Sequence, residues 1–174
     1  MNILLSHPSR LLPHGLSPAL LALAMLLGGC GGNVPMPKID LPKPPPPTRL
    51  VMEVNASRQL NINTDGTAAP LLVRIYELRD GGQFMGSGFF PLYENDRGTL
   101  GADLVGRDEI FFKPGETRVI EKTLSPTTTT IGVMGAYRST DERRWRATAP
   151  ILPEKVNRFR LDLGSRELAL SPQP

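Results

Sequence analysis

Histidine and cysteine are scarce in this chain of 174 residues. The two histidines, His7 and His14, and the single cysteine, Cys30, all lie within the first 30 residues. Residues 31–174 therefore cannot supply a Cys–His nucleophile pair, a Ser-His-Asp triad or a zinc site of imidazole and thiolate ligands. One cysteine also excludes a disulfide within the chain, so the fold must depend on its hydrophobic core alone.

Aromatic residues and long apolar runs are also few. Paired carboxylates could hydrolyse glycosides, but a small domain would then need an aromatic-lined cleft, and the chain has one tryptophan and three tyrosines. The main apolar run, residues 16–27, is shorter than the roughly 20 residues that cross a bilayer. These shortages argue against an enzyme, and we expect neither a metal nor an organic cofactor.

The apolar run is typical of a secretory signal, because it follows Arg10 and ends in small residues. It ends in the sequence Leu-Gly-Gly-Cys, with Cys30 last, and this order looks like a bacterial lipobox. Cleavage there would leave an N-terminal cysteine that can carry acyl chains, and two or more such chains anchor a protein stably. Gly31, rather than an aspartate, after the cysteine favours the outer membrane in the bacterial sorting rule.

We therefore expect residues 1–29 to be a removed signal peptide and Cys30 to be the lipidation site. The protein would then lie on the periplasmic face of the outer membrane, held by its lipid anchor. The alternative is a free or buried cysteine behind an ordinary signal peptide. Without Arg10 the chain carries 19 Lys and Arg against 17 Asp and Glu, a net charge of +2, which does not indicate nucleic-acid binding.

Proline dominates the segment that follows the cysteine. Residues 31–48 contain Pro35, Pro37, Pro42 and Pro44 to Pro47. Because proline fixes φ and removes a hydrogen-bond donor, residues 30–48 should form a semi-rigid extended tether of at most about 55 Å. A proline-rich stretch can also bind an aromatic-lined groove, but directly behind a lipid anchor we favour the tether.

Residues 49–174 are sufficient for one domain, and their pattern is typical of short strands. Leu50, Met52 and Val54 alternate with outward-facing neighbours, a period of two. Turn residues such as Pro114 and Gly115 separate most of the strand candidates. The other strand candidates are residues 71–76, 108–113, 117–124, 130–138, 146–151, 158–163 and, more weakly, 167–170. This spacing predicts an all-β fold, a two-sheet antiparallel sandwich.

One segment, residues 84–105, breaks the strand pattern. It is rich in aromatic residues and contains Gly86, Gly88, Gly98 and Gly101, too many glycines for a long helix. We expect a small helical insertion of one or two short turns, packed on the sandwich by its aromatic side chains.

Two surface features are candidates for binding a partner. The connection 58–70 is long, because hairpin loops usually have about 2 to 5 residues, and long ordered loops often carry function. A short strand at Leu60 and Ile62, with a turn at Asp65 and Gly66, is an alternative or additional interpretation. The second feature is an arginine group near Trp145, typical of interface hot spots, although Asp141, Glu142 and Asp162 could form ordinary surface pairs with it. Its members are Arg138, Arg143, Arg144, Arg146, Arg158 and Arg160.

The loop also bears a weak similarity to the opening of a calcium loop. Asn63, Asp65 and Gly66 have the residue types found there, but no glutamate stands at the closing position. We therefore expect no metal site in it.

The order of these motifs resembles one protein family. A lipobox, a proline-rich tether, Pro70 followed by LVRIYEL at 72–78, the segment 84–105 and KPGE at 113–116 follow one another as in the TssJ family, also called SciN or VasD. These are outer-membrane lipoproteins of the type VI secretion system. The resemblance extends from Cys30 to about Leu163 and implies a transthyretin-like β-sandwich with a small helical addition.

The resemblance also implies an adaptor function. In that family the domain binds the periplasmic C-terminal region of TssM, and so fastens a complex of TssJ, TssL and TssM to the outer membrane. The loop between the first two strands is implicated in that contact. Carried onto this chain, the partner-binding residues are Leu60, Asn61, Ile62, Asn63, Thr64, Asp65 and Gly66.

A fold alone does not decide a function, so two further hypotheses stay open. The first is a periplasmic lipoprotein that binds a small ligand or a carbohydrate. The second is a structural subunit of another envelope machine. Neighbouring genes for a sheath, TssK, TssL and TssM would favour the adaptor, whereas genes for sugar uptake or hydrolases would favour the ligand binder.

The lipid anchor predicts that Cys30→Ser abolishes lipidation, because a serine hydroxyl cannot form the thioether that carries the diacylglycerol. In cells fed radioactive palmitate, we expect label on the wild-type protein and none on the variant at equal protein level. Equal labelling of both would show that Cys30 does not carry a lipid anchor.

Overall fold

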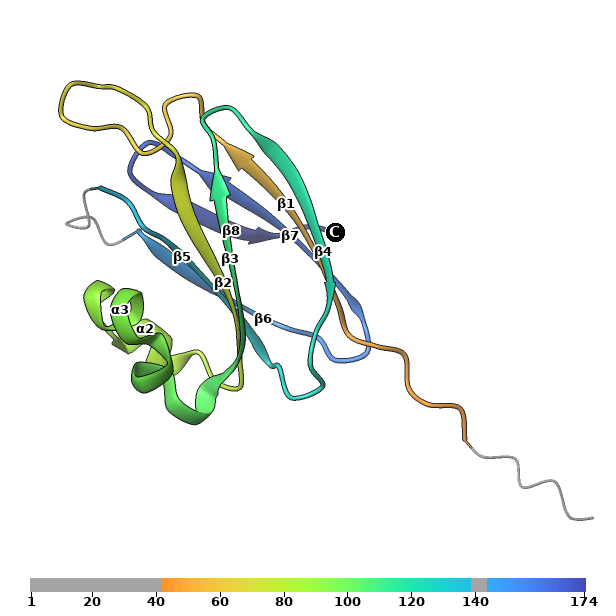
Figure 1. Ribbon diagram of the computed structural model, residues 1–174. Helices are drawn as coiled ribbons and strands as arrows, with labels where there is room; N and C mark the ends of the chain where they lie inside the picture. The colour runs from red at the N-terminus through yellow and green to blue at the C-terminus, as the bar shows by residue number, and fades with distance from the viewer. Residues whose placement is uncertain (1–41, 139–143) are drawn as a thin grey trace, which may run out of the picture. The chain divides into compact units, whose positions relative to one another are not determined.

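The computed structural model describes residues 42–138 and 144–174, so the predicted signal peptide, Cys30 and most of the tether lie outside the described residues. Within them the chain forms eight strands in two sheets and a helical insertion (Figure 1). The strands are β1 Arg49–Ala56, β2 Leu71–Leu78, β3 Leu104–Phe112, β4 Thr117–Thr123, β5 Thr130–Gly135, β6 Arg146–Pro150, β7 Val156–Leu163 and β8 Leu168–Pro172. The insertion consists of α2 Gly82–Gly86, α3 Phe89–Leu100 and the 3-10 helix η1 Gly101–Asp103.

Each sheet has four strands, in the orders β4-β1-β7-β8 and β3-β2-β5-β6. The predicted all-β, two-sheet sandwich is confirmed. All strand pairs are antiparallel except β1 and β7, which run parallel from Arg49 opposite Val156 to Ala56 opposite Leu163. This pair departs from the predicted antiparallel arrangement, because it joins strands far apart in the sequence and not a hairpin.

All eight strand candidates are strands, but the insertion differs in its bounds. It covers residues 82–103, and β3 begins at Leu104, four residues before the predicted strand. Helix α3 has 12 residues and is kinked at Asn95, whose φ is −145° and ψ is 60°, so it is longer than the one or two turns expected. No helix in residues 42–138 or 144–174 is both long and apolar enough to cross a membrane.

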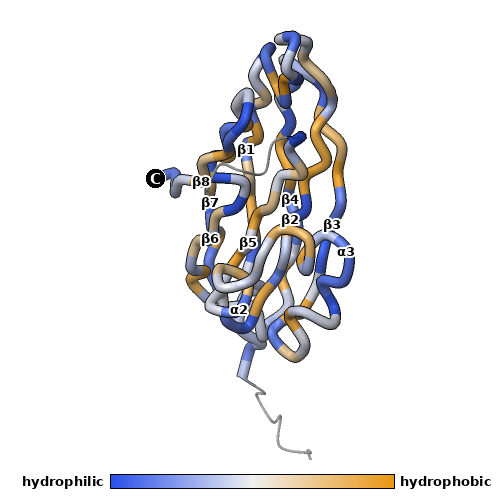
Figure 2. Tube along the Cα trace, turned by 90° about the vertical axis from the view of Figure 1, so that its left-hand side faces the viewer, coloured by the Kyte–Doolittle hydropathy of each residue, from blue (hydrophilic) through white to orange (hydrophobic). Residues whose placement is uncertain are grey.

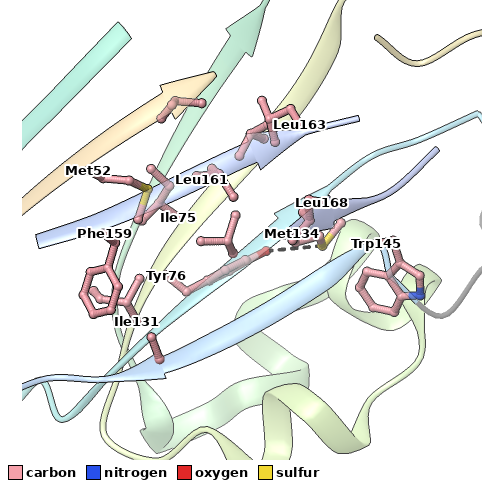
Figure 3. Packing of buried hydrophobic residues seen from close by; sticks show 14 of the residues in the cluster. Met52, Ile75, Tyr76, Ile131, Met134, Trp145, Phe159, Leu161, Leu163 and Leu168 are labelled. Atoms are coloured by element: carbon pink, nitrogen blue, oxygen red, sulfur yellow. Dashed lines mark hydrogen bonds between the residues drawn. The ribbon is translucent and has the colours of Figure 1, made fainter. Parts of the chain in front are cut away.

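The core lies between the inner faces of the two sheets. Leu50, Met52 and Val54 are fully buried on β1, and Phe159 and Leu161 are buried on β7. Figure 3 shows Met52, Phe159 and Leu161 packed near Ile75 and Ile131 of the other sheet. Apolar residues recur along the strands of both sheets (Figure 2). Each large side chain buried in this way contributes about 1.5 to 3 kcal/mol.

The helical insertion packs on the outer face of the β3-β2-β5-β6 sheet. The rings of Tyr76 and Phe84 lie 5.2 Å apart. Gly132, which pairs with Tyr76 in the sheet, allows this approach, because a Cβ there would lie 3.2 Å from the Phe84 ring. The sheet therefore carries a second, smaller apolar layer beneath α2.

Buried polar groups fix α3 to the same sheet. The guanidinium of Arg74 donates to the carbonyl oxygens of Leu92 (3.2 Å) and Tyr93 (2.8 Å), just before the kink in α3. Asp96 accepts hydrogen bonds from the Tyr76 hydroxyl (3.3 Å) and from Arg107 (2.5 Å). Burial raises the pKa of Tyr76 to about 12, so its hydroxyl stays protonated and able to donate.

A second buried carboxylate, Glu77 on β2, joins the two sheets at one edge. It accepts hydrogen bonds from Lys122 of β4 (2.8 Å), from the Ser125 amide (2.9 Å) and from the Thr128 hydroxyl (2.9 Å). Burial alone would raise the pKa of Glu77, but these hydrogen bonds outweigh it and lower the pKa below its ordinary value. The ionised carboxylate therefore stabilises the folded state.

The depressed pKa predicts a pH-dependent effect of Glu77→Gln. Since the folded pKa lies below the ordinary glutamate value of 4.5, the stabilisation is present above about pH 4.5 and is lost as the pH falls through the folded pKa. We expect Glu77→Gln to lower the free energy of unfolding by about 1 to 3 kcal/mol at pH 7, and by progressively less as the pH falls below about 4.5. Urea unfolding of both proteins at pH 7, 4 and 3 measures this.

A matched control is Glu121→Gln, because Glu121 lies exposed, 3.6 Å from Arg49. Such a surface pair should change the free energy of unfolding by less than about 1 kcal/mol. A Glu77→Gln deficit that stays constant over the whole pH range would refute the role given to the carboxylate.

Candidate partner-binding site

The predicted binding loop lies at one end of the sandwich, between β1 and β2. It leaves β1 at Ala56 and enters the other sheet at Leu71, so it crosses from one sheet to the other. The turns between β3 and β4 and between β7 and β8 lie at the same end, and the chain enters β1 at the opposite end (Figure 1). We call residues 60–66 the tip loop.

The first residue of the tip loop, Leu60, is buried at the end of the hydrophobic core. Leu60 is fully buried in the hydrophobic core, and its carbonyl oxygen accepts a hydrogen bond from the Ala69 amide at 3.0 Å. Residues 58–61 form turns and Ile62 is irregular, so the predicted short strand at Leu60 and Ile62 is wrong. The apolar alternation of Leu60 and Ile62 has another cause, because Leu60 alone is fully buried and covers the end of the core.

Asn61 ties the tip loop to two other segments. Its side chain is 5% exposed, donates to the Pro70 carbonyl at 2.9 Å and accepts from the Arg138 amide at 2.9 Å. Its φ is 48°, in the left-handed region that asparagine tolerates better than most residues. The next amide, of Ile62, donates to the Ser165 carbonyl in the β7–β8 turn at 3.1 Å.

The far part of the tip loop is a turn organised by Asn63. Its side-chain oxygen accepts from the amides of Asp65 (3.1 Å) and Thr67 (2.8 Å), and Gly66 has a φ of 78°, so the predicted turn at Asp65 and Gly66 is present. The asparagine oxygen that could have faced a calcium ion is thus used within the turn. In the described part of the chain, no three His, Cys, Asp or Glu side chains gather as a metal site would require.

The seven predicted residues therefore have different surroundings. Leu60 and Asn61 are buried, Ile62 and Asn63 are half-buried, and Thr64 to Gly66 are exposed. A depression of about 250 Å³ lies beside them, lined by Ile62, Asn63, Thr64, Arg138 and Arg166. The sequence offered no signal for Arg166, because the β7–β8 turn reaches the tip loop only through the parallel pairing of β1 and β7.

The arginine group predicted near Trp145 does not act as one surface. Arg146 lies 4.4 Å above the Trp145 ring and donates to the carbonyl oxygens of Phe84 (2.8 Å) and Ser87, so it holds α2 against β6. Burial lowers the pKa of Arg146. The other described members are dispersed: Arg138 at the tip loop, Arg144 paired with Glu167 at 2.8 Å, and Arg158 and Arg160 exposed on β7. Arg143 lies outside the described residues.

The sequence predicts a lipoprotein, and the structure shows a β-sandwich domain with an ordered surface loop as its candidate site. A family model described as "Type VI secretion lipoprotein, VasD, EvfM, TssJ, VC_A0113" matches residues 48–166. The chain belongs to this family. It is thus a membrane-bound lipoprotein component of the type VI secretion apparatus, and the matched region includes the tip loop and the helical insertion.

Solved structures agree with this assignment. The T6SS lipoprotein TssJ1 from Pseudomonas aeruginosa is 38% identical, with a TM-score of 0.71, over 74% of this chain and 98% of that chain. Lip from Serratia marcescens, a membrane-bound component of the type VI secretion system, is 25% identical, with a TM-score of 0.66, over 74% and 99%. No curated protein sequence matches this chain.

A third structure shares the fold. It is described as "T6SS protein TssM C-terminal domain (869-1107) from EAEC", and a chain in it is 18% identical to this one, with a TM-score of 0.57, over 73% of this chain and 98% of that chain. At this identity the likeness concerns the fold.

The contacts of Asn61 predict that Asn61→Ala loosens the tip loop. The variant leaves the Pro70 carbonyl and the Arg138 amide without their partner and puts alanine at a positive φ. We expect the free energy of unfolding to fall by about 1 to 3 kcal/mol and hydrogen exchange at Arg138 to accelerate. Asn61→Gly, which relieves φ but restores neither hydrogen bond, should show the same faster exchange.

Asn55→Ala is the matched control, since Asn55 is half-buried on β1 and contacts only side chains, of Glu53 and Thr117. Its free energy of unfolding should stay within about 0.5 kcal/mol of wild type. Unchanged exchange at Arg138 in Asn61→Ala would show that Asn61 does not hold the loop.

Proposed function

We propose that this protein fastens the type VI membrane complex to the outer membrane by binding the periplasmic C-terminal region of TssM through the tip loop. In this proposal, residues 1–29 are removed, acylated Cys30 lies in the periplasmic leaflet of the outer membrane, and residues 30–48 are the tether of the sandwich domain 49–174. TssM, together with TssL, would complete the complex.

The observation that carries this proposal is the position of the tip loop relative to the tether. The chain arrives at β1 through the buried Thr48, whose hydroxyl accepts from the Glu154 amide and whose carbonyl accepts from the Leu124 amide, at 2.8 and 2.9 Å. The segment that leads to the tip loop leaves the same strand at its other end, after Ala56. The eight residues of β1 span about 26 Å, so the tip loop faces away from the anchored end.

The exposed part of the tip loop suits a protein contact. Thr64, Asp65 and Gly66 face solvent, while Leu60 and Asn61 hold the segment in one conformation from below. A loop that is already ordered loses little conformational freedom on binding, and this favours affinity. This arrangement supports a binding role.

The comparisons add support from related structures. The structure described for the TssM C-terminal domain from EAEC has a matching chain of this fold. Membership of a type VI secretion lipoprotein family favours the adaptor over the hypothesis of a carbohydrate or small-ligand binder.

The proposal predicts that Thr64→Ala combined with Asp65→Ala weakens binding to the purified periplasmic C-terminal region of TssM. Truncating a hot-spot side chain at the centre of an interface costs about 2 kcal/mol or more. If the exposed tip is such a centre, we expect the dissociation constant to rise at least tenfold, measured by isothermal titration calorimetry. The fold should be unaffected, because among the described residues the only hydrogen bond of these two side chains is the one that the Asp65 carboxylate accepts from Asn63 at 3.5 Å.

The matched control is Thr127→Ala combined with Glu94→Ala, which removes the same two kinds of exposed side chain away from the tip loop. This control should bind as wild type. Equal affinity of the two double variants would exclude the tip loop as the site, and absence of binding by the wild-type protein would exclude the TssM contact.

A further inference from the structure

We propose that Arg138 and Arg166 extend the binding surface of the tip loop and that the protein partner presents carboxylates to them. The proposal rests on the proposed function, since it concerns the partner bound by the tip loop. It adds two residues from separate turns to the binding surface, and the local sequence of the loop does not indicate them. It also assigns a negative charge to the surface of the partner.

Both arginines are positioned by segments bonded directly to the tip loop. The Arg138 amide donates to the Asn61 side chain at 2.9 Å. The carbonyl of Ser165, the neighbour of Arg166, accepts from the Ile62 amide at 3.1 Å. The two exposed arginines thus line the same depression, of about 250 Å³, together with Ile62, Asn63 and Thr64.

Two arginines line the depression and one exposed carboxylate, Asp65, follows the lining residue Thr64, so the net charge there is positive and favours an acidic ligand. Glu167 is paired with Arg144 at 2.8 Å, and Glu116 at the β3–β4 turn is paired with Arg118. Among the described residues, no ion pair involves Arg138 or Arg166. Arginine binds carboxylates in a bidentate manner, so both guanidinium groups suit an acidic partner.

The composition of the depression fits a protein surface. It combines an apolar side chain, Ile62, with the polar Asn63 and Thr64 and with two arginines, and arginine is enriched at protein interfaces. A lipid headgroup would supply anionic charge as well, but the depression lies at the end of the sandwich opposite to the tethered end of β1. We therefore infer an acidic protein surface.

Two charge-reversal variants test the proposal: Arg138→Glu combined with Arg166→Glu, and Arg166→Glu alone. The single variant is included because Asp141 and Glu142, which follow Arg138 in the sequence, lie outside the described residues. Binding to the periplasmic C-terminal region of TssM is measured by surface plasmon resonance at 50 and 500 mM NaCl. At 50 mM NaCl we expect the double variant to bind at least tenfold more weakly, mainly through slower association. The difference should shrink at 500 mM, where salt screens exposed charges.

The control is Arg97→Glu with Lys155→Glu, which changes the net charge equally at exposed positions away from the tip loop and should bind as wild type. Urea unfolding of all variants establishes that they are folded. Normal binding by both Arg166→Glu and the Arg138/Arg166 variant, while Thr64→Ala/Asp65→Ala binds weakly, would overturn this inference and leave the proposed function intact. If the Thr64/Asp65 variant also binds normally, the tip loop is not the binding site, and the proposed function itself is contradicted.

A lipid surface gives a different result. Wild-type domain would then sediment with phosphatidylglycerol vesicles at 50 mM NaCl, the Arg138/Arg166 variant would not, and both would bind TssM equally. That combination would overturn the inference in favour of a membrane contact.

Discussion

Packing between the inner faces of the two sheets is the interaction on which this domain depends. With a single cysteine at position 30, no disulfide can constrain the chain, and no metal cluster occurs among the described residues. Met52, Phe159 and Leu161 on one sheet and Ile75 and Ile131 on the other are each at most 4% exposed. Leu60 closes this core at one end, so the conformation of the tip loop is tied to the stability of the sandwich.

Buried polar groups then decide how the remaining parts attach to that core. Arg74 and Asp96 hold the kinked α3 on the outer face of one sheet, and Glu77 joins β2 to β4 at the edge. Asn61 does the same for the tip loop, with one hydrogen bond to each of two segments. Throughout the described residues, every buried side-chain nitrogen or oxygen has a hydrogen-bond partner. Attachments of this kind specify one geometry, because a shifted segment would leave buried groups unpaired.

The sequence was sufficient for the fold class because the strands alternate cleanly, as in β7, where Asn157, Phe159, Leu161 and Leu163 point inward. It was insufficient wherever two distant segments meet. The parallel pairing of β1 with β7, the 12-residue α3 and the approach of Arg166 to the tip loop all arise from tertiary contacts that no local pattern encodes. The position of the tip loop was predictable from its length, but the division between its buried residues and its exposed ones required the structure.

The course of β1 has a mechanical consequence for an anchored protein that binds through its tip loop. Tension between the membrane and the partner would enter at Thr48 and leave near Ile62, so it would run through the covalent backbone of one strand. That strand is paired along its length with β4 on one side and β7 on the other. Because both ends of that path lie on the same strand, the covalent backbone would carry the load, and little of it would fall on the hydrogen bonds to the two neighbouring strands. The other five strands would stay largely outside the path of the force, so a contracting machine could pull on this domain without opening its core.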